Sequence, residues 1–208
     1  GNTFTIPSGL SIDMQANSIN VNAKNSGVLV DRSEAFLNAS GVTFTGSSTG
    51  SGLIQYNGFL GTGQAEFWSG GTMDKCTFNN VRFDIGQYSK PKITNSNLTI
   101  TSSVNATAFM ISGYINNNAN GFTTPELSGN KIVGYKYPFV ISNDAYPTIS
   151  GNDVSGCVFK GIGLQGTFYT NYTLGDYNKL PYQLSYSLYI YGNTFTIPSG
   201  LSIDMQAN

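Results

Sequence analysis

The sequence contains no histidine, and charged residues make up only 10% of its 208 residues. The absence of imidazole excludes Ser-His-Asp and Cys-His catalysis and histidine-ligated metal sites. Ten Lys and Arg are scattered among eleven Asp and Glu, so no basic patch is available to neutralise the phosphates of a nucleic acid. No run of 18 apolar residues occurs, which excludes a membrane-spanning helix. We therefore expect no cofactor, no metal, no nucleic-acid partner and no membrane insertion.

Strong helix formers are also scarce. Glu, Lys and Ala are few, whereas Gly, Ser, Thr, Asn and Tyr are abundant, and this balance favours an all-β chain. The two cysteines, Cys76 and Cys157, are too few for a disulfide framework. We expect them not to be bonded to each other.

The segment that begins the chain recurs unchanged at its end. Gly1 to Asn17 reads GNTFTIPSGLSIDMQAN, and Gly192 to Asn208 reads the same. This identity predicts a tandem array with a period of 191 residues, in which both copies of the segment have one conformation. A cloning duplication or a designed overlap is the alternative, and either would leave the 191-residue unit intact.

A shorter pattern recurs inside the long one: an apolar residue, two further residues, Asn or a small residue, one more residue, and a second apolar residue. The clearest copies are LSGNKI, ISGNDV and IYGNTF, which start at Leu127, Ile149 and Ile190. A second apolar alternation follows each copy, as in residues 81–85, after a turn rich in Gly, Asn or Ser. Strand, turn, strand, turn in about 20 residues or more predicts one coil of a β-solenoid.

On these motifs the chain resembles the right-handed parallel β-helix family with the pectate-lyase-like repeat, and tandem-repeat extracellular fibre or adhesin proteins. The resemblance implies an all-β, right-handed parallel β-helix (β-solenoid) with about six rungs per 191-residue repeat. Residues 1–191 would be one complete solenoid repeat unit, and residues 192–208 the start of the next. The turn asparagines would stack and share amide hydrogen bonds; they are Asn130, Asn152 and Asn193. Other rungs carry Ser40, Cys76 or Ser96 at the equivalent place. A β-sandwich is the alternative fold, and it predicts evenly spaced antiparallel hairpins.

Aromatic residues gather in two longer segments, residues 57–72 and 165–189, which we interpret as excursions from the coil. A tyrosine ring is large and rigid with a polar tip, which suits contact with a sugar or a protein, although such rings also simply cover apolar surface. The candidate contact surface consists of Trp68, Tyr169, Tyr172, Tyr177, Tyr182 and Tyr186.

Two further sets of residues are candidate sites. Four N-x-[ST] sequons are candidate glycosylation sites, at Asn38, Asn97, Asn105 and Asn171. The nearest approach to a catalytic cluster is Arg82 with Asp84, with Asp13 expected two coils earlier on the same face. At about 10 Å from Asp84, Asp13 would be too distant for a glycosidase carboxylate pair, which needs about 5–9.5 Å. We therefore predict no catalytic residue.

Together these observations predict a structural role. Near-identical repeats joined by backbone ladders would form a stiff rod, and low charge would permit rods to bundle laterally. We expect the repeat unit of an extracellular or cell-surface fibre or adhesin shaft, whose main partner is a further copy stacked end to end. A carbohydrate-binding or carbohydrate-cleaving β-helix, such as a polysaccharide lyase or hydrolase, is the alternative, and surface glycans are a second candidate partner.

Overall fold

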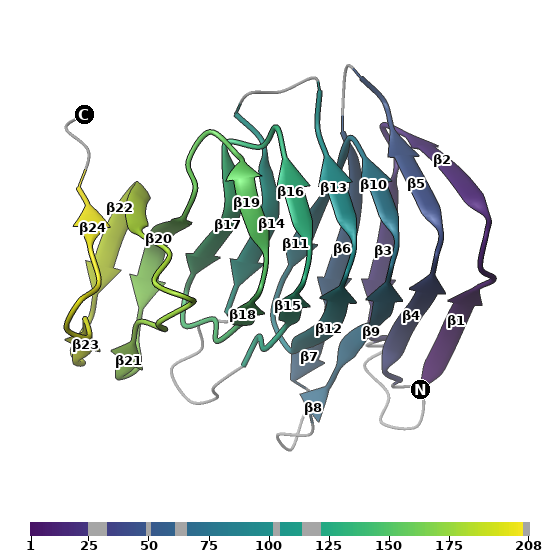
Figure 1. Ribbon diagram of the computed structural model, residues 1–208. Helices are drawn as coiled ribbons and strands as arrows, with labels where there is room; N and C mark the ends of the chain where they lie inside the picture. Colours follow the sequence, from purple (N-terminus) through teal and green to yellow (C-terminus); the bar gives the residue numbers. More distant parts are fainter. Residues whose placement is uncertain (25–32, 49–50, 61–65, 102–104, 114–121, 206–208) are drawn as a thin grey trace.

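The computed structural model describes residues 1–24, 33–48, 51–60, 66–101, 105–113 and 122–205. Every regular element in these residues is a β-strand, and the strands of all three large sheets pair in parallel. The chain passes from sheet A to sheet B to sheet C and returns to sheet A, so that successive coils lie side by side along one axis (Figure 1). The fold is therefore β-solenoid-like. Among the described residues, no helix is long and apolar enough to cross a membrane.

Sheet A consists, in spatial order, of β1 (Asn2–Ile6), β4 (Ala35–Ser40), β9 (Ser69–Asp74), β12 (Ser89–Thr94), β15 (Glu126–Ser128) and β18 (Thr148–Ser150). Sheet B consists of β2 (Ser11–Gln15), β5 (Thr43–Gly46), β10 (Thr77–Asn79), β13 (Asn97–Thr99), β16 (Lys131–Val133) and β19 (Asp153–Gly156).

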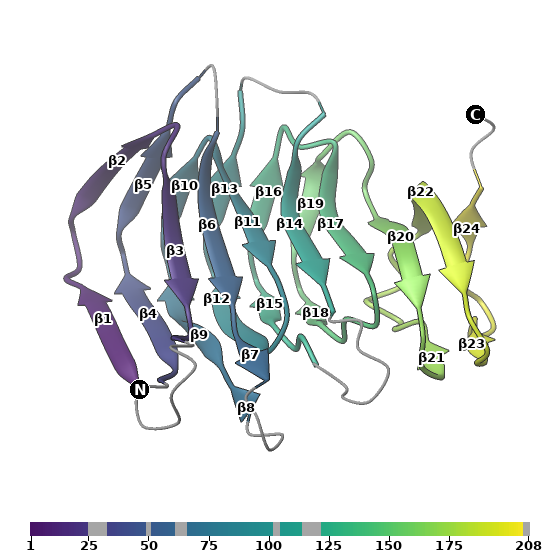
Figure 2. The ribbon, with the colours of Figure 1, turned by 180° about the vertical axis from the view of Figure 1, so that it is seen from behind.

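Sheet C lies behind both in Figure 1 and faces the viewer in Figure 2. It consists of β3 (Ser18–Asn22), β6 (Gly52–Asn57), β11 (Val81–Ile85), β14 (Thr107–Ser112), β17 (Tyr137–Ser142), β20 (Ile162–Phe168), β22 (Tyr182–Ile190) and β24 (Ile203–Asp204). Two short pairs complete the fold: antiparallel β7 (Phe59–Leu60) with β8 (Glu66–Phe67), and parallel β21 (Tyr172–Thr173) with β23 (Phe195–Thr196).

The core is a set of columns of apolar side chains that run along the axis. Parallel pairing without a register shift puts equivalent residues beside each other, so inward side chains of successive coils stack. One column of sheet C consists of Ile54, Phe83, Phe109, Phe139, Ile162 and Tyr182. The rings of Phe83 and Phe139 lie 5.0 Å and 5.6 Å from the ring of Phe109, and both are nearly parallel to it. All these side chains are almost wholly buried.

The short sequence motif marks the corner between sheets A and B rather than one strand. In LSGNKI, Leu127 belongs to β15 and Ile132 to β16, with Gly129 and Asn130 between them. Gly129 has φ +66°, a left-handed conformation that glycine adopts without strain. We expected two strands per coil, and this was wrong. The motif contains a bend that separates a strand of sheet A from a strand of sheet B, so a full coil has three strands.

Polar side chains at this corner form a hydrogen-bonded ladder between coils. The Asn130 amide donates to Asn152 Oδ1 (3.0 Å) and to the Ile93 carbonyl (2.9 Å), and Asn130 Oδ1 accepts from the Ser96 N–H (3.0 Å). Ser96 Oγ in turn accepts from the Cys76 N–H (3.0 Å).

Asn193 was expected in this ladder and lies outside it, and Ser40, expected to interrupt the ladder at the position equivalent to Cys76, stands elsewhere. Asn193 is exposed, and its amide donates to the carbonyls of Tyr169 and Tyr191 instead. Ser40 pairs with Asp74, and Val42 of the same coil lies beside Cys76 of the next coil. The sequence motif matched Ser40 to Cys76, and this match was wrong by two positions.

Replacing Asn130 by alanine should lower the free energy of unfolding by about 1–3 kcal/mol for each buried group left unpaired, of which the Ser96 N–H and the Ile93 carbonyl are two. Denaturant unfolding followed by circular dichroism measures this loss. Asn97→Ala, on the exposed face of β13, is the matched control and should change stability by less than about 0.5 kcal/mol. Equal effects of the two substitutions would show that the ladder contributes nothing specific.

Residues 165–189 form a further coil rather than an excursion. Ile162 pairs with Tyr182, and Leu164 with Leu184, so the chain returns to sheet C within this segment. Tyr182 in turn pairs with Ile203 of β24. Since the inward side of this coil joins the existing column, its inward aromatic residues Phe168, Tyr172 and Tyr182 become core.

Candidate functional site

The two identical segments lie at opposite ends of the solenoid. The first contains β1 and β2, and the second contains β23 and β24 (Figure 1). Each has one edge paired with the body of the molecule, and within the described residues its other edge has no strand beside it. Unpaired strand edges are templates for pairing with another chain, so the two ends are the natural candidates for an assembly interface.

The first copy is tightly held. β1 pairs with β4 along its whole length, from Asn2 beside Ala35 to Ile6 beside Ala39. β2 continues into sheet B and pairs there with β5. As a result, the side chains of Ile6 and Met14 are 5% and 4% exposed.

The second copy is loosely held. β23 pairs with β21 only at Phe195 and Thr196, and β24 pairs with β22 only at Ile203 and Asp204. Ile197 and Met205, the counterparts of Ile6 and Met14, are 50% and 68% exposed. The turn is common to both copies, since Gly9 and Gly200 have φ +81° and +82°.

The strands differ between the copies, because β2 lies in sheet B whereas β24 lies in sheet C. The prediction of one shared conformation was therefore wrong for the strands. The physical reason is that the two copies have different neighbouring strands. The first copy lies beside β5 of sheet B. At the other end, sheet B of the described residues ends at β19, and the second copy pairs with β22 of sheet C instead.

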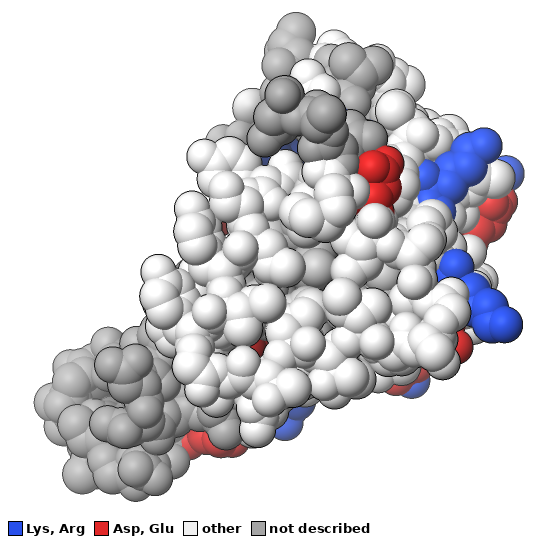
Figure 3. Space-filling model, turned by 90° about the vertical axis from the view of Figure 1, so that its left-hand side faces the viewer, with Lys and Arg blue, Asp and Glu red and all other residues white. Residues whose placement is uncertain are grey.

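The end that carries the second copy has few charged side chains. Figure 3 views this end and shows a surface with charged side chains mainly near its rim. The exposed large hydrophobic side chains of the last coils include Tyr186, Tyr189, Ile190, Tyr191, Ile197 and Met205. At the opposite end, an open hollow of about 430 Å³ is lined by residues of β1, β3 and β4, among them Phe4, which is 68% exposed. Apolar surface concentrated in this way marks sites of protein association.

The predicted aromatic contact surface divides into exposed and buried members. Tyr186 and Tyr169 are 76% and 38% exposed, and Trp68 is partly buried beneath the ammonium group of Lys90, which lies 4.6 Å from its ring centroid. Tyr177 is partly buried and packs against the core.

Tyr172 and Tyr182 are core residues, at 2% and 0% exposure, so assigning them to a contact surface was wrong. Their hydroxyl groups donate to the carbonyls of Ala145 (2.5 Å) and Gly175 (2.8 Å), which lets the polar tips be buried.

The sequon asparagines lie on the outside of the solenoid. Asn97, Asn105 and Asn171 are exposed, and Asn38 is partly exposed. Two of them already hold neighbouring coils together: Asn38 Oδ1 accepts from the Thr72 N–H (2.8 Å), and Asn171 Oδ1 from the Thr194 N–H (2.9 Å). Among the described residues, the side chains of Asn97 and Asn105 make no hydrogen bond to a neighbouring coil.

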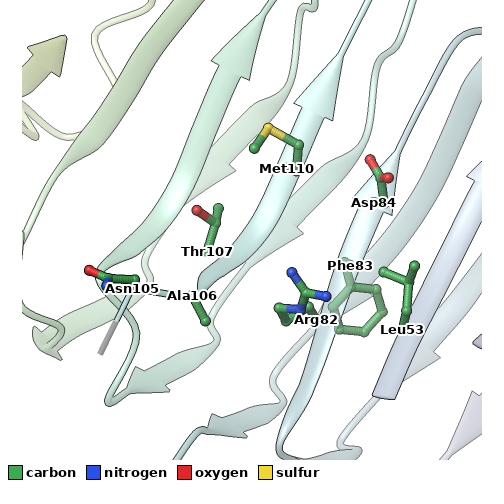
Figure 4. A pocket seen from close by; sticks show the side chains of 8 residues that line it. All are labelled: Leu53, Arg82, Phe83, Asp84, Asn105, Ala106, Thr107 and Met110. Atoms are coloured by element: carbon green, nitrogen blue, oxygen red, sulfur yellow. The ribbon is translucent and has the colours of Figure 1, made fainter. Parts of the chain in front are cut away.

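A hollow of about 340 Å³ on the outer face of sheet C contains the Arg82 and Asp84 pair (Figure 4). Its lining consists of Leu53, Arg82, Phe83, Asp84, Asn105, Ala106, Thr107 and Met110. Burial raises the pKa of the Asp84 carboxyl, and the nearby Arg82 charge partly offsets this effect.

Asp13 does not face this hollow. It pairs with Thr45 in sheet B, whereas Asp84 belongs to sheet C. Placing Asp13 and Asp84 on one face was therefore wrong, because β2 and β11 belong to different sheets. Among the described residues, no group of three or more His, Cys, Asp or Glu could hold a metal ion.

Both cysteines are free and buried, which confirms that they are not bonded to each other. Burial raises the pKa of both thiols, that of Cys157 to about 12. We expect neither to react with a thiol reagent at pH 8 while the chain is folded, since the reactive thiolate is absent. In denaturant two thiols should react, and colorimetric titration counts them. Rapid labelling of the folded chain would contradict the burial.

Comparisons of this chain with protein-family models, with curated proteins and with solved structures found no match. The class of protein is thus defined by its architecture, an all-β solenoid-like stack of parallel sheets whose ends carry one repeated segment.

Proposed function

We propose that the chain is the repeat unit of an extracellular or cell-surface fibre or adhesin shaft, in which units stack end to end into one continuous solenoid. The proposal includes a right-handed β-helix related to the pectate-lyase-like repeat family. The further coil at residues 165–189 raises the expected six rungs per repeat to about seven. The observation that carries the proposal is the identity of residues 1–17 and 192–208. The strands of both copies lie at opposite ends of the stack, and among the described residues no strand lies beside their outer edges.

The chemistry of the ends supports this role. Parallel ladders continue from coil to coil at about 4.8 Å, and each new unit would satisfy backbone groups that an end coil leaves open. The apolar residues of the last coils would then be buried in the joint. Head-to-tail contact of two different surfaces produces an open filament when the rotation between units does not close into a ring, and stacking along one axis does not close.

Assembly of the purified chain tests the proposal. On concentration we expect filaments one solenoid wide by electron microscopy, with a meridional spacing of about 4.8 Å in fibre diffraction. Ile190→Asp, which puts a charge on the end that carries the second copy, should suppress them. Asn97→Asp puts the same charge on the exposed side of β13 and should not. A chain that stays monomeric at all concentrations, or equal effects of the two variants, would contradict the proposal.

The same assay addresses lateral contacts. Tyr186 is the most exposed aromatic ring of the last coils, and it is a candidate for lateral bundling or for contact with surface glycans.

The mass of the natural protein under denaturing conditions separates two forms of the fibre. A mass near that of one unit indicates separate subunits, and a multiple of it indicates a covalent array.

The hollow on sheet C favours one alternative, a carbohydrate-binding or carbohydrate-cleaving β-helix. It combines the charged Arg82 and Asp84 with polar Asn105 and Thr107 on an outer sheet face. A screen of soluble glycans, with detection of new reducing ends or unsaturated products, tests it. Binding or product formation that Arg82→Ala abolishes would favour this alternative.

A further inference from the structure

We propose that neighbouring units are joined by exchange of the repeated segment: residues 192–205 of one copy occupy, on a second copy, the site that residues 1–14 fill against β4 and β5. The inference rests on the proposed end-to-end fibre and specifies how its joint is made. The partner is a second copy of this chain, and the surface it binds is the first coil's site on sheets A and B.

The acceptor site recognises one sequence, and the chain carries that sequence twice. Residues 192–205 can repeat every contact of residues 1–14, because the side chains are identical. On the acceptor, Ile197 would take the place of Ile6 and Met205 that of Met14, both nearly fully buried there. Within one molecule the exchange is impossible, since the two segments lie at opposite ends of the stack (Figure 1).

The two copies are held unequally, which identifies the donor. The first copy pairs with β4 along the whole of β1 and makes further pairs with β5. The second makes two residue pairs with β21 and two with β22, and it leaves Ile197 and Met205 largely exposed. Moving the second copy into the acceptor site exchanges the two pairs with β22 for a longer ladder and buries both apolar side chains.

The edges of the donor strand are compatible with this joint. β23 pairs with β21 through one edge, while β1 pairs with β4 through the edge that faces the following coil. One segment can therefore pair with β21 of its own unit and with β4 of the next unit at the same time. The rungs across the joint are then those of an uninterrupted chain, and residues 1–14 of the second unit leave the site. Exchange of an identical element between protomers is an established route to assembly.

Pairs of introduced cysteines distinguish exchange from plain stacking of the two ends. Ser11 pairs with Thr43 in sheet B, so Ser202, the counterpart of Ser11, lies beside Thr43 of a second copy only after exchange. The double variant Ser202→Cys with Thr43→Cys should give a ladder of disulfide-linked multimers on oxidation. Thr196→Cys with Thr5→Cys is the matched pair that joins when β23 merely stacks on β1. The unmodified chain, with its two buried thiols, controls for background.

Multimers from the Ser202–Thr43 pair in clear excess over the Thr196–Thr5 pair support exchange. Multimers mainly from the Thr196–Thr5 pair overturn exchange and leave the end-to-end fibre intact. Multimers from neither pair also overturn it, and the absence of filaments in the same samples would remove the fibre proposal as well.

The duplication provides a second test, because one substitution can be placed in either copy. Ile6→Asp weakens the resident segment, and exchange predicts more assembled chain at a given concentration, since the intact residues 192–205 can take the site. Ile197→Asp buries an unpaired carboxylate in the donated segment and should reduce assembly about tenfold or more. Sedimentation velocity measures both, with circular dichroism to verify the fold. Equal loss of assembly in the two variants would overturn exchange.

Discussion

Replacing Phe109 by alanine should lower the free energy of unfolding by about 3–5 kcal/mol, the usual cost of deleting a buried aromatic ring. The ring is fully buried between Phe83 and Phe139, with centroids 5.0 Å and 5.6 Å away. Backbone ladders to β11 and β17 hold both sides of β14, so the neighbouring coils cannot close the cavity. Denaturant unfolding measures the loss.

Phe4→Ala is the matched control, because its ring is 68% exposed at the first coil. We expect a change below about 0.5 kcal/mol there. Comparable losses in the two variants would mean that the stacked column does not carry the stability attributed to it.

Tyr182→Ala should be about as damaging as Phe109→Ala, about 3–5 kcal/mol. Its ring is fully buried between Ile162 and Ile203, and its hydroxyl donates to the Gly175 carbonyl. Burial also raises the pKa of the Tyr182 phenol, so the group stays neutral in the folded chain at moderately alkaline pH. Thermal or denaturant unfolding provides the measurement.

Tyr186 lies further along β22 and is 76% exposed, which makes Tyr186→Ala the control. It should leave unfolding almost unchanged and alter lateral association instead, visible by pelleting or microscopy. If Tyr182→Ala proved as mild as Tyr186→Ala, the assignment of residues 165–189 to an additional coil would be wrong.

The sequence predicts the parallel stack because its regularities are local and repeated. LSGNKI and ISGNDV each combine an inward apolar residue, a left-handed glycine and a turn asparagine, and all three requirements come from one corner of the coil. Asn130 and Asn152 can therefore be placed beside each other from the sequence alone.

Which residues of neighbouring coils pair with each other is harder to predict from a sequence, and the wrong predictions for Tyr182 and Asp13 arise from this. The sequence assigns Tyr182 to a loop because tyrosine suits both a core and a surface. A signal that it is core is present, since Tyr182-Gln-Leu184 repeats the alternation of Ile162-Gly-Leu164, the segment beside which it pairs. The prediction placed Asp13 on the wrong face because we interpreted a motif that bends around a corner as a single strand. Two different sheets were therefore treated as one.

The corner between sheets A and B has the same short length in five coils. It is the length of Gly129 and Asn130 between β15 and β16, and it recurs between β4 and β5, β9 and β10, β12 and β13, and β18 and β19. Connections from sheet C back to sheet A vary instead: the one from β3 to β4 spans positions 23–34, whereas the one from β11 to β12 spans only positions 86–88. Insertions are therefore accommodated where the chain leaves sheet C, while the A–B corner keeps one length in these five coils and is longer in the first coil, where it spans positions 7–10. A peptide grafted between β11 and β12 would be displayed at a fixed height on the rod, and in an array it would recur once per repeat.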